Sequence, residues 1–157
     1  MTKIKILCAA ACVALLPVLA VASVPAAGPS ADSVVAARKA GFKKIGGAMK
    51  AIRDQLASGG TNRPVMVGAA QTMAATAREQ AKLFPAGSGP GAGVKTDALP
   101  AIWTDRATFD AAMNRLIAES TKLAAVAGSG DAAAITTQLK ATGATCAACH
   151  KQFRADD

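Results

Sequence analysis

The chain has 157 residues but no Tyr, one Trp, one His and only 3% aromatic residues, although 52% of its residues are apolar. Alanine supplies much of this apolar content, and alanine favours helices while its side chain fills little volume. A core with so few large side chains would be weakly packed on its own. The composition therefore indicates a helical protein whose interior holds a bulky group that is not protein.

Histidine and cysteine are too scarce for several kinds of site. His150 is the only histidine, and Cys146 and Cys149 are the only cysteines after the first 26 residues. These three residues fall short of the roughly four ligands of a structural zinc site. A disulfide between cysteines this close in sequence would close almost no loop and would stabilise little. A thioredoxin-like dithiol normally lies in a βαβ unit. The sequence has no strand-like runs, which argues against this kind of site.

Residues 1–26 have the pattern of a secretory signal peptide, so residues 27–157 are expected to form the mature domain. Lys3 and Lys5 form the charged start of the leader, and its apolar stretch leads to a cleavage site that we place after Ala26. Pro17 interrupts this stretch, whose length is near the lower limit for a transmembrane helix, so no stable membrane anchor is expected. The protein is therefore expected in the periplasm.

The charge of the chain is positive. It carries 18 Lys and Arg against 10 Asp and Glu, a formal net charge of +8 at pH 7, which falls to +6 without Lys3 and Lys5. The basic residues are dispersed along the sequence, so nucleic acid is not an expected partner. A basic surface attracts acidic proteins, so the redox partner, which the sequence does not identify, is expected to be acidic.

Four helical segments are predicted from apolar residues spaced three and four apart and from the breaks between them. They cover about 31–57, 62–84, 104–127 and 131–153. Residues 85–103 are rich in Gly and Pro and predict a crossover between two helical pairs. Two short turns and one longer crossover are typical of an all-α, antiparallel up-down-up-down four-helix bundle. The candidate N-caps of the first three are Asp32 or Ser33, Thr61 or Asn62, and Thr104 or Asp105, and the fourth segment starts at Asp131.

The last helical segment contains Cys146-Ala147-Ala148-Cys149-His150, a C-x-x-C-H sequence that is the attachment signature of a c-type haem. Two thiols three residues apart on a helix lie on one face, so each can form a thioether with one vinyl group of the same porphyrin. His150 lies four residues after Cys146 and offers an imidazole nitrogen to the iron. The motif therefore predicts one covalently bound haem c per chain, near the end where the last helix finishes.

Three stretches carry a resemblance to a known family. Residues 100–109 read Pro-Ala-Ile-Trp-Thr-Asp-Arg-Ala-Thr-Phe, residues 149–154 read Cys-His-Lys-Gln-Phe-Arg, and residues 35–42 read Val-Ala-Ala-Arg-Lys-Ala-Gly-Phe. They resemble the Pro-x-Ile-Trp-Ser/Thr-Asp-x-x-x-Phe segment, the Cys-His-x-x-Phe/Tyr-Arg ending and the first helix of class II c-type cytochromes, most closely the cytochrome c′ family. That family also carries its haem motif near the C-terminus.

The resemblance implies roles for further residues. Arg38 matches an arginine expected to pair with a haem propionate, and Lys39, which replaces the family's usual Gln, is a second candidate. Phe42 matches the distal position opposite His150, which implies a five-coordinate, high-spin haem. Arg154 would lie on the proximal side, near the imidazole. Alternatively, Arg38 and Lys39 lie on a solvated face of the helix and bind no propionate. Arg154 is alternatively a surface cation that the dipole at the C-terminal end of the helix favours.

The resemblance also implies that the protein binds small gases such as NO and CO and transfers electrons. Members of the family commonly form antiparallel homodimers through the first two helices, so a homodimer is expected as an option here. An apolar distal pocket without a hydrogen-bond donor disfavours O₂ and suits NO and CO. It contains no evident acid or base, so an enzyme is not predicted.

Two alternative functions remain open. The first is a low-spin electron carrier of the cytochrome c556 type, with Met49, Met66 or Met73 as the sixth iron ligand, although methionine on an apolar stripe more often packs than binds metal. Met49 follows Phe42 by two turns, about 10 Å, so it is not expected to reach the same iron. The second alternative, from another class, is an exported dithiol oxidoreductase that uses Cys146 and Cys149.

Overall fold

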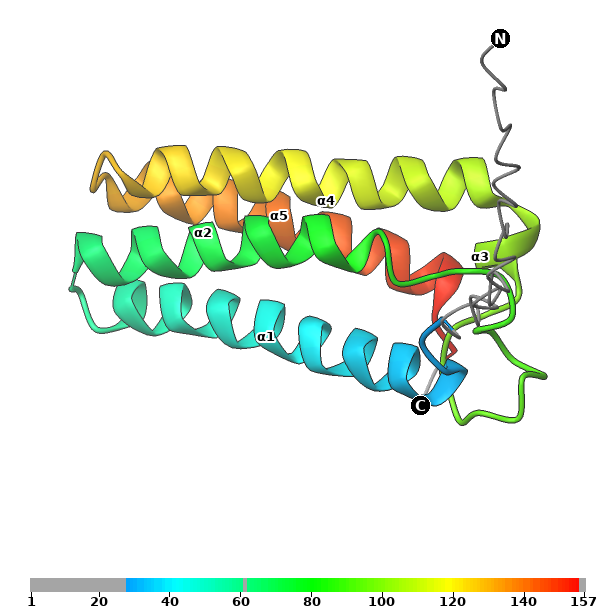
Figure 1. Cartoon of the computed structure of the whole chain (residues 1–157). Coiled ribbons are helices and arrows are strands. Elements are labelled where there is room, and N and C mark those ends of the chain that lie inside the picture. Colours follow the sequence, from blue (N-terminus) through cyan, green and yellow to red (C-terminus); the bar gives the residue numbers. More distant parts are fainter. Residues whose placement is uncertain (1–27, 61, 156–157) are drawn as a thin grey trace, which may run out of the picture.

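The computed structural model describes residues 28–60 and 62–155. Four long helices run side by side and the chain reverses direction between successive ones, which confirms the predicted antiparallel four-helix bundle (Figure 1). Within the described ranges, none of the helices combines the length and the apolar character that a membrane crossing needs. The predicted signal peptide, residues 1–26, lies outside these ranges. The helices are α1 (Ala31–Ala57), α2 (Arg63–Gln80), α3 (Ala101–Thr104), α4 (Arg106–Ala127) and α5 (Ala132–Phe153).

Polar side chains at the N-caps set where the long helices begin. α1 differs from the prediction, because Ser30 is its cap and accepts a hydrogen bond from the N–H of Ser33. Ser30 has an extended backbone, with ψ at 155°, as an N-cap residue does. Asp32 therefore lies in the first turn of the helix, where its negative charge interacts favourably with the helix dipole. The caps of α2 and α4, Asn62 and Asp105, are predicted ones. Asp131, predicted as the first residue of the last helix, is the N-cap of α5.

α2 ends at Gln80, whereas the periodicity predicted helix as far as residue 84. The N–H of Leu83 bonds to the carbonyl of Gln80, three residues back, which tightens the final turn. Pro85 disfavours a helical backbone at the residue before it. Phe84 therefore leaves the helix, and its ring packs edge-on against Phe109 with 4.7 Å between the ring centroids.

The crossover between α2 and α4 contains the short helix α3, which the sequence did not predict, and it is tied to the end of α5. The N–H of Leu99 donates to the carbonyl of Phe153 at 3.0 Å, and the N–H of Ala155 donates to the carbonyl of Asp97 at 2.8 Å. These bonds flank a single antiparallel bridge between Ala98 and Arg154. The crossover therefore fixes the position of the segment that follows the C-x-x-C-H motif.

The helices do not close into a full ring. α1 packs along α2, α2 along α4 and α4 along α5, whereas α1 and α5 touch each other at few points. The two short turns lie at one end of the bundle, while the crossover, the start of α1 and the end of α5 gather at the other end (Figure 1). The seam between α1 and α5 is therefore the least filled part of the interior.

The core has two parts. An aliphatic cluster runs along the bundle and includes Ile52, Met66, Met73, Leu123 and Ile135. The second cluster lies at the crossover end and consists of Phe84, Ile102, Phe109, Met113 and Phe153, with Phe42 and Trp103 packed against it. The sequence's few aromatic side chains are thus concentrated at one end of the bundle.

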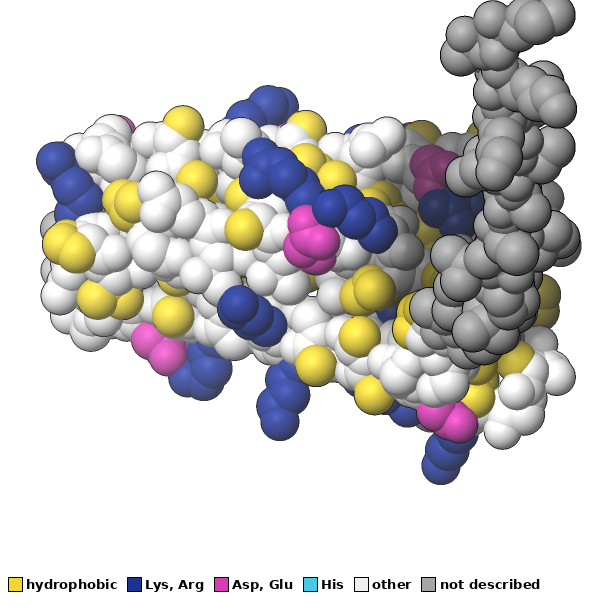
Figure 2. All heavy atoms as spheres, viewed as in Figure 1, with side chains coloured by type: hydrophobic (Ala, Val, Ile, Leu, Met, Phe, Trp, Pro, Cys, Tyr) yellow, Lys and Arg dark blue, Asp and Glu magenta, His cyan; other side chains and the backbone are white. Residues whose placement is uncertain are grey.

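Surface charges on the described residues are partly paired along the helices. On the face that Figure 2 shows, Lys and Arg side chains are spread along the bundle, and some stand beside acidic side chains. Exposed pairs of this kind contribute roughly 0–1 kcal/mol each. The pairs are Lys50–Asp54, Lys82–Glu79, Arg106–Asp110 and Lys122–Glu119.

α1 and α2 approach closely where Gly41 faces the buried side chain of Gln80. A Cβ built on Gly41 would lie 1.8 Å from Nε2 of Gln80, so only glycine permits this packing. Gln80 is 2% exposed and cannot move its amide into solvent without repacking the interface. Because Phe42 follows Gly41 directly, this contact also sets where Phe42 enters the interior.

We predict that Gly41→Ala lowers the free energy of unfolding of the haem-loaded protein by about 1–3 kcal/mol, as expected when extra volume is forced into a packed interface. Gly47→Ala on the same helix is the control, because a Cβ there meets nothing within 4 Å. That control should gain about 0.5–1 kcal/mol from the higher helix propensity of alanine. Urea unfolding followed by circular dichroism measures both, and a gain in stability for Gly41→Ala would contradict the predicted close contact.

Candidate functional site

A cavity of about 680 Å³ lies along the seam between α1 and α5. Its volume is within the range of about 300–1,000 Å³ typical of pockets for small molecules and cofactors. Apolar side chains form most of its wall, and charged ones stand around it. The apolar lining includes Val35, Phe42, Ile45 and Met49 of α1, Phe109, Met113 and Leu116 of α4, and Phe84 and Ile102 of the crossover.

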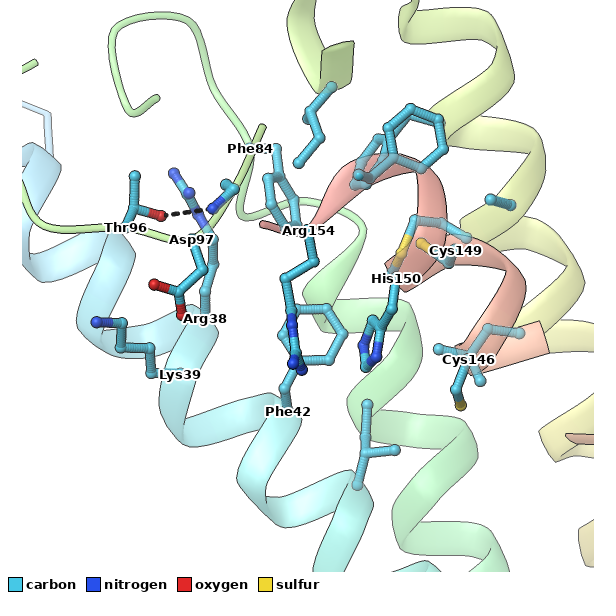
Figure 3. Close-up of a pocket in the computed structure, with 18 of the residues that line it drawn as sticks. Arg38, Lys39, Phe42, Phe84, Thr96, Asp97, Cys146, Cys149, His150 and Arg154 are labelled. Atoms are coloured by element: carbon cyan, nitrogen blue, oxygen red, sulfur yellow. Dashed lines mark hydrogen bonds between the residues drawn. The ribbon is translucent and has the colours of Figure 1, made fainter. Parts of the chain in front are cut away.

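The three residues of the C-x-x-C-H motif all line this cavity from α5 (Figure 3). Both cysteines are half-buried and free, and no disulfide joins them. Cys146 packs against the aliphatic cluster, and Cys149 packs against the aromatic cluster at the crossover end. The two thiols therefore lie where the two parts of the core meet, at the wall of the cavity.

The surroundings keep these side chains in their neutral forms. Burial raises the pKa of the Cys146 thiol, and burial together with the neighbouring Cys146 raises the pKa of the Cys149 thiol. Partial burial, with a smaller contribution from the positive charge of Arg154, lowers the pKa of His150. A neutral imidazole retains a nitrogen lone pair, which is the form that binds a metal.

Phe42 and His150 reach toward the cavity from opposite sides, Phe42 from α1 and His150 from α5 (Figure 3). The structure thus brings together Phe42 and His150, which the family resemblance placed on opposite faces of the haem. Met49 also lines the cavity, but its methyl group lies 3.8 Å from the position of a Cβ on Gly143, so it reaches across to α5. Met66 and Met73 are fully buried in the aliphatic cluster and are not among the lining residues.

Arg38 is 4% exposed, and most of the N–H groups of its guanidinium donate hydrogen bonds to residues at the start of the crossover. Its Nε donates to the carbonyl of Leu83 at 2.6 Å, and its Nη2 donates to the carbonyl and the hydroxyl of Ser88. The guanidinium also lies over the ring of Phe84, 4.5 Å from the centroid. Nη1 is buried and has no hydrogen-bond partner among the described residues. Burial lowers the pKa of Arg38 from its ordinary value.

Lys39 and Arg154 also line the cavity, as the sequence anticipated, and both are exposed to solvent. Lys39 Nζ donates to the carbonyl of Lys95 in the crossover at 3.3 Å. Sequence reasoning missed two charged lining residues, Lys43 and Asp97. Lys43 lies one turn after Lys39 on α1, a spacing that could have revealed it, whereas nothing in the sequence places Asp97 near α5.

The residues present fit a haem. The apolar wall suits a porphyrin, the two free thiols and the neutral imidazole are the donors of a c-type haem site, and Nη1 of Arg38 is an unsatisfied buried donor suited to a carboxylate. A site in which side chains alone bind a metal ion is not supported, because the described ranges contain no group of three or more His, Cys, Asp or Glu that could hold one.

Comparisons with known proteins agree with this geometry. The sequence model of a family described as Cytochrome C′ matches residues 33–154. A cytochrome c′ of Rhodocyclus tenuis is 32% identical over 128 residues, which is 80% of this chain and 96% of that protein. The crystal structure of cytochrome c′ from Thermochromatium tepidum superposes with a TM-score of 0.75 at 30% identity, covering 83% of this chain and all of that one. A solved cytochrome c′ described as having ligand-controlled dimer dissociation superposes with a TM-score of 0.76 at 29% identity, with the same coverage.

We predict that Arg38→Lys destabilises the haem-loaded protein by about 2–3 kcal/mol, because a lysine cannot satisfy the Leu83 carbonyl and Ser88 together and leaves buried acceptors unpaired. It should also make the Gly-rich part of the crossover, residues 85–95, more sensitive to proteolysis. Arg53→Lys on the exposed face of α1 is the control and should change neither property. Thermal unfolding and limited trypsin digestion measure the two effects; equal behaviour of both variants would show that Arg38 does not hold the crossover.

Proposed function

The chain belongs to the cytochrome c′ family and carries one c-type haem, and on that premise we propose that it is an exported protein whose haem iron binds small gases such as NO and CO. Cys146 and Cys149 would form the two thioethers, and His150 would be the axial protein ligand. The haem supplies the iron that binds gases and changes its oxidation state. The cavity walls decide which molecules reach that iron.

Phe42 is the observation that carries this proposal. It lies across the cavity from His150, and its ring has no lone pair to give to iron (Figure 3). The sixth coordination position would therefore remain open to an outside ligand. Ile45 and Met49 extend the apolar wall and supply no hydrogen-bond donor, which favours NO and CO over O₂ because bound O₂ gains from polar stabilisation. The same residues provide no general acid or base, which supports gas binding and electron transfer rather than catalysis.

Electron transfer with a Met as sixth ligand is the second candidate, and the position of Met49 bears on it. Met49 lines the cavity, but it is two turns from Phe42 and its methyl group points to Gly143 of α5. This contact is consistent with Met49 closing the inner end of the cavity rather than binding iron. The dithiol alternative is weakened by the raised pKa of both thiols, because the thiolate is the reactive form.

Other parts of the proposal extend beyond the site. Residues 1–26 would direct export to the periplasm and be removed, which leaves 27–157 as the haem domain. We propose that Arg38, through Nη1, and Lys39 contact the propionates, and that Arg154 lies beside the imidazole. A homodimer through α1 and α2 is consistent with the dimer named for the solved relative at 29% identity.

We predict that the purified ferric and ferrous protein shows the absorption bands of high-spin haem, and that CO and NO each bind the ferrous form. An open sixth position is the physical reason. A sharp low-spin α band with a Met–Fe charge-transfer band would support the Met-ligated carrier instead. A colourless protein would overturn the haem function altogether.

We also predict that Phe42→Met converts the spectrum to low-spin, because a thioether placed opposite His150 can bind the open position. Ile45→Met is the matched control: it places a thioether on the same wall of the cavity, one turn along α1. This control should remain high-spin. If Phe42→Met also remains high-spin with a normal haem content, Phe42 is not the residue over the iron.

A further inference from the structure

The mouth of the cavity is lined by more positive than negative charge. Lys39 and Lys43 on α1, together with Arg154 after α5, line the cavity, and Asp97 is the only acidic lining residue among the described residues. Figure 3 shows Lys39, Asp97 and Arg154 at this site. The backbone contact from Lys39 to Lys95 brings a further lysine of the crossover to the same side. We call Lys39, Lys43 and Lys95 the basic rim. Lys39 and Lys43 line the cavity that the proposed haem would occupy, and Lys95 follows in the crossover beside Lys39.

Lys39 and Lys43 form no ion pair with a carboxylate of the described residues. All four ion pairs found among the described residues lie elsewhere on the bundle, and neither lysine takes part in one. The Lys39 contact to a backbone carbonyl brings no negative charge. The two lysines are also four residues apart on one helix, where like charges repel each other. This arrangement costs some stability and leaves the opening positive.

We propose that the basic rim is the docking surface for the acidic face of a partner protein that exchanges electrons with the haem; this inference rests on the proposed function. Lys39 and Lys43 are exposed and follow each other by one turn along α1, so they suit an extended acidic surface better than a small anion. Charges beside a redox centre steer oppositely charged partners and raise association rates in a salt-dependent way.

A membrane surface fits the rim less well than an acidic protein does. Peripheral membrane binding needs a large apolar side chain that can enter the lipid boundary next to the cations. Val65, on α2, is the exposed large hydrophobic residue of the described chain, and it is not among the residues that line the cavity. The rim therefore offers charge without an apolar anchor.

The test uses the ferrous haem-loaded protein and hexacyanoferrate(III) as a small anionic oxidant. One electron passes from the ferrous haem to the oxidant, which gives the ferric haem and hexacyanoferrate(II), and stopped-flow absorbance at the Soret band measures the rate. We expect the rate to fall as ionic strength rises. At low ionic strength, Lys43→Glu should reduce it about threefold, and Lys39→Glu/Lys43→Glu about tenfold, with a weaker salt dependence.

Lys140→Glu is the matched control, because it makes the same charge change on α5, ten residues before His150. That is about 15 Å along the helix, beyond the Debye length of about 10 Å at 0.1 M salt. Its rate should stay within twofold of the unmodified protein. Lys43→Glu alone separates docking from the proposed propionate contact of Lys39.

Poly-L-glutamate then tests whether the rim accepts an acidic polypeptide. It should slow the oxidation of the unmodified protein and of Lys140→Glu, but not that of the double variant. Inhibition by phosphatidylglycerol vesicles without inhibition by poly-L-glutamate would assign the rim to a membrane and overturn the proposal. A rate that falls with salt while poly-L-glutamate has no effect would leave only a site for small anions, which also overturns it.

Failure of this inference can be told apart from failure of the proposed function. A normal haem spectrum with equal rates for Lys43→Glu and Lys140→Glu overturns the docking surface alone. A protein without a Soret band overturns the haem function, and no oxidation can then be recorded.

Discussion

The structure depends on where a few aromatic side chains pack inside an alanine-rich bundle. Alanine lets helices approach closely, so an undirected bundle of this composition would close its own interior. Phe84, Phe109 and Phe153 stack edge to face, with centroid separations of 4.7 and 5.3 Å along the series, at the crossover end. They fill the space between the crossover, α4 and the end of α5, while α1 remains largely separate from α5. The cavity lies along that separation, and the aromatic cluster forms part of its wall.

The burial of Arg38 links this architecture to the cofactor. A buried guanidinium is costly unless it is paired and hydrogen-bonded. Here backbone carbonyls and a serine hydroxyl hold it, and no carboxylate of the described chain forms an ion pair with it. The charge therefore has dipoles around it but no counterion, and one buried nitrogen remains unsatisfied. A propionate at the cavity would supply what the protein leaves out, and the same guanidinium would then join the cofactor to the crossover.

The local features were predictable from sequence, and the long-range ones were not. The C-x-x-C-H spacing places two thiols and an imidazole on the last turns of one helix. Helix geometry alone therefore predicts that all three side chains line the same wall of the cavity. α1 was predicted with its observed bounds because its apolar spacing and the glycines after it are local signals. The contact of Arg38 with Ser88 spans fifty residues, and the departure of Phe84 from α2 reflects packing against Phe109. Periodicity carries no information about either contact.

The placement of acidic residues explains why net charge alone could not locate a docking surface. Asp105 and Asp131 are used as helix caps, and Asp54, Glu79, Asp110 and Glu119 are paired with cations three or four residues away in the sequence. These local demands remove negative charge from the seam between α1 and α5, where Asp97 is the one acidic residue of the described chain that lines the cavity. A haem there would add two propionates, and Arg38 would offer a buried positive partner for one of them. The exposed lysines then keep the edge of the opening positive, so a partner's acidic face would be drawn to the part of the surface nearest the iron.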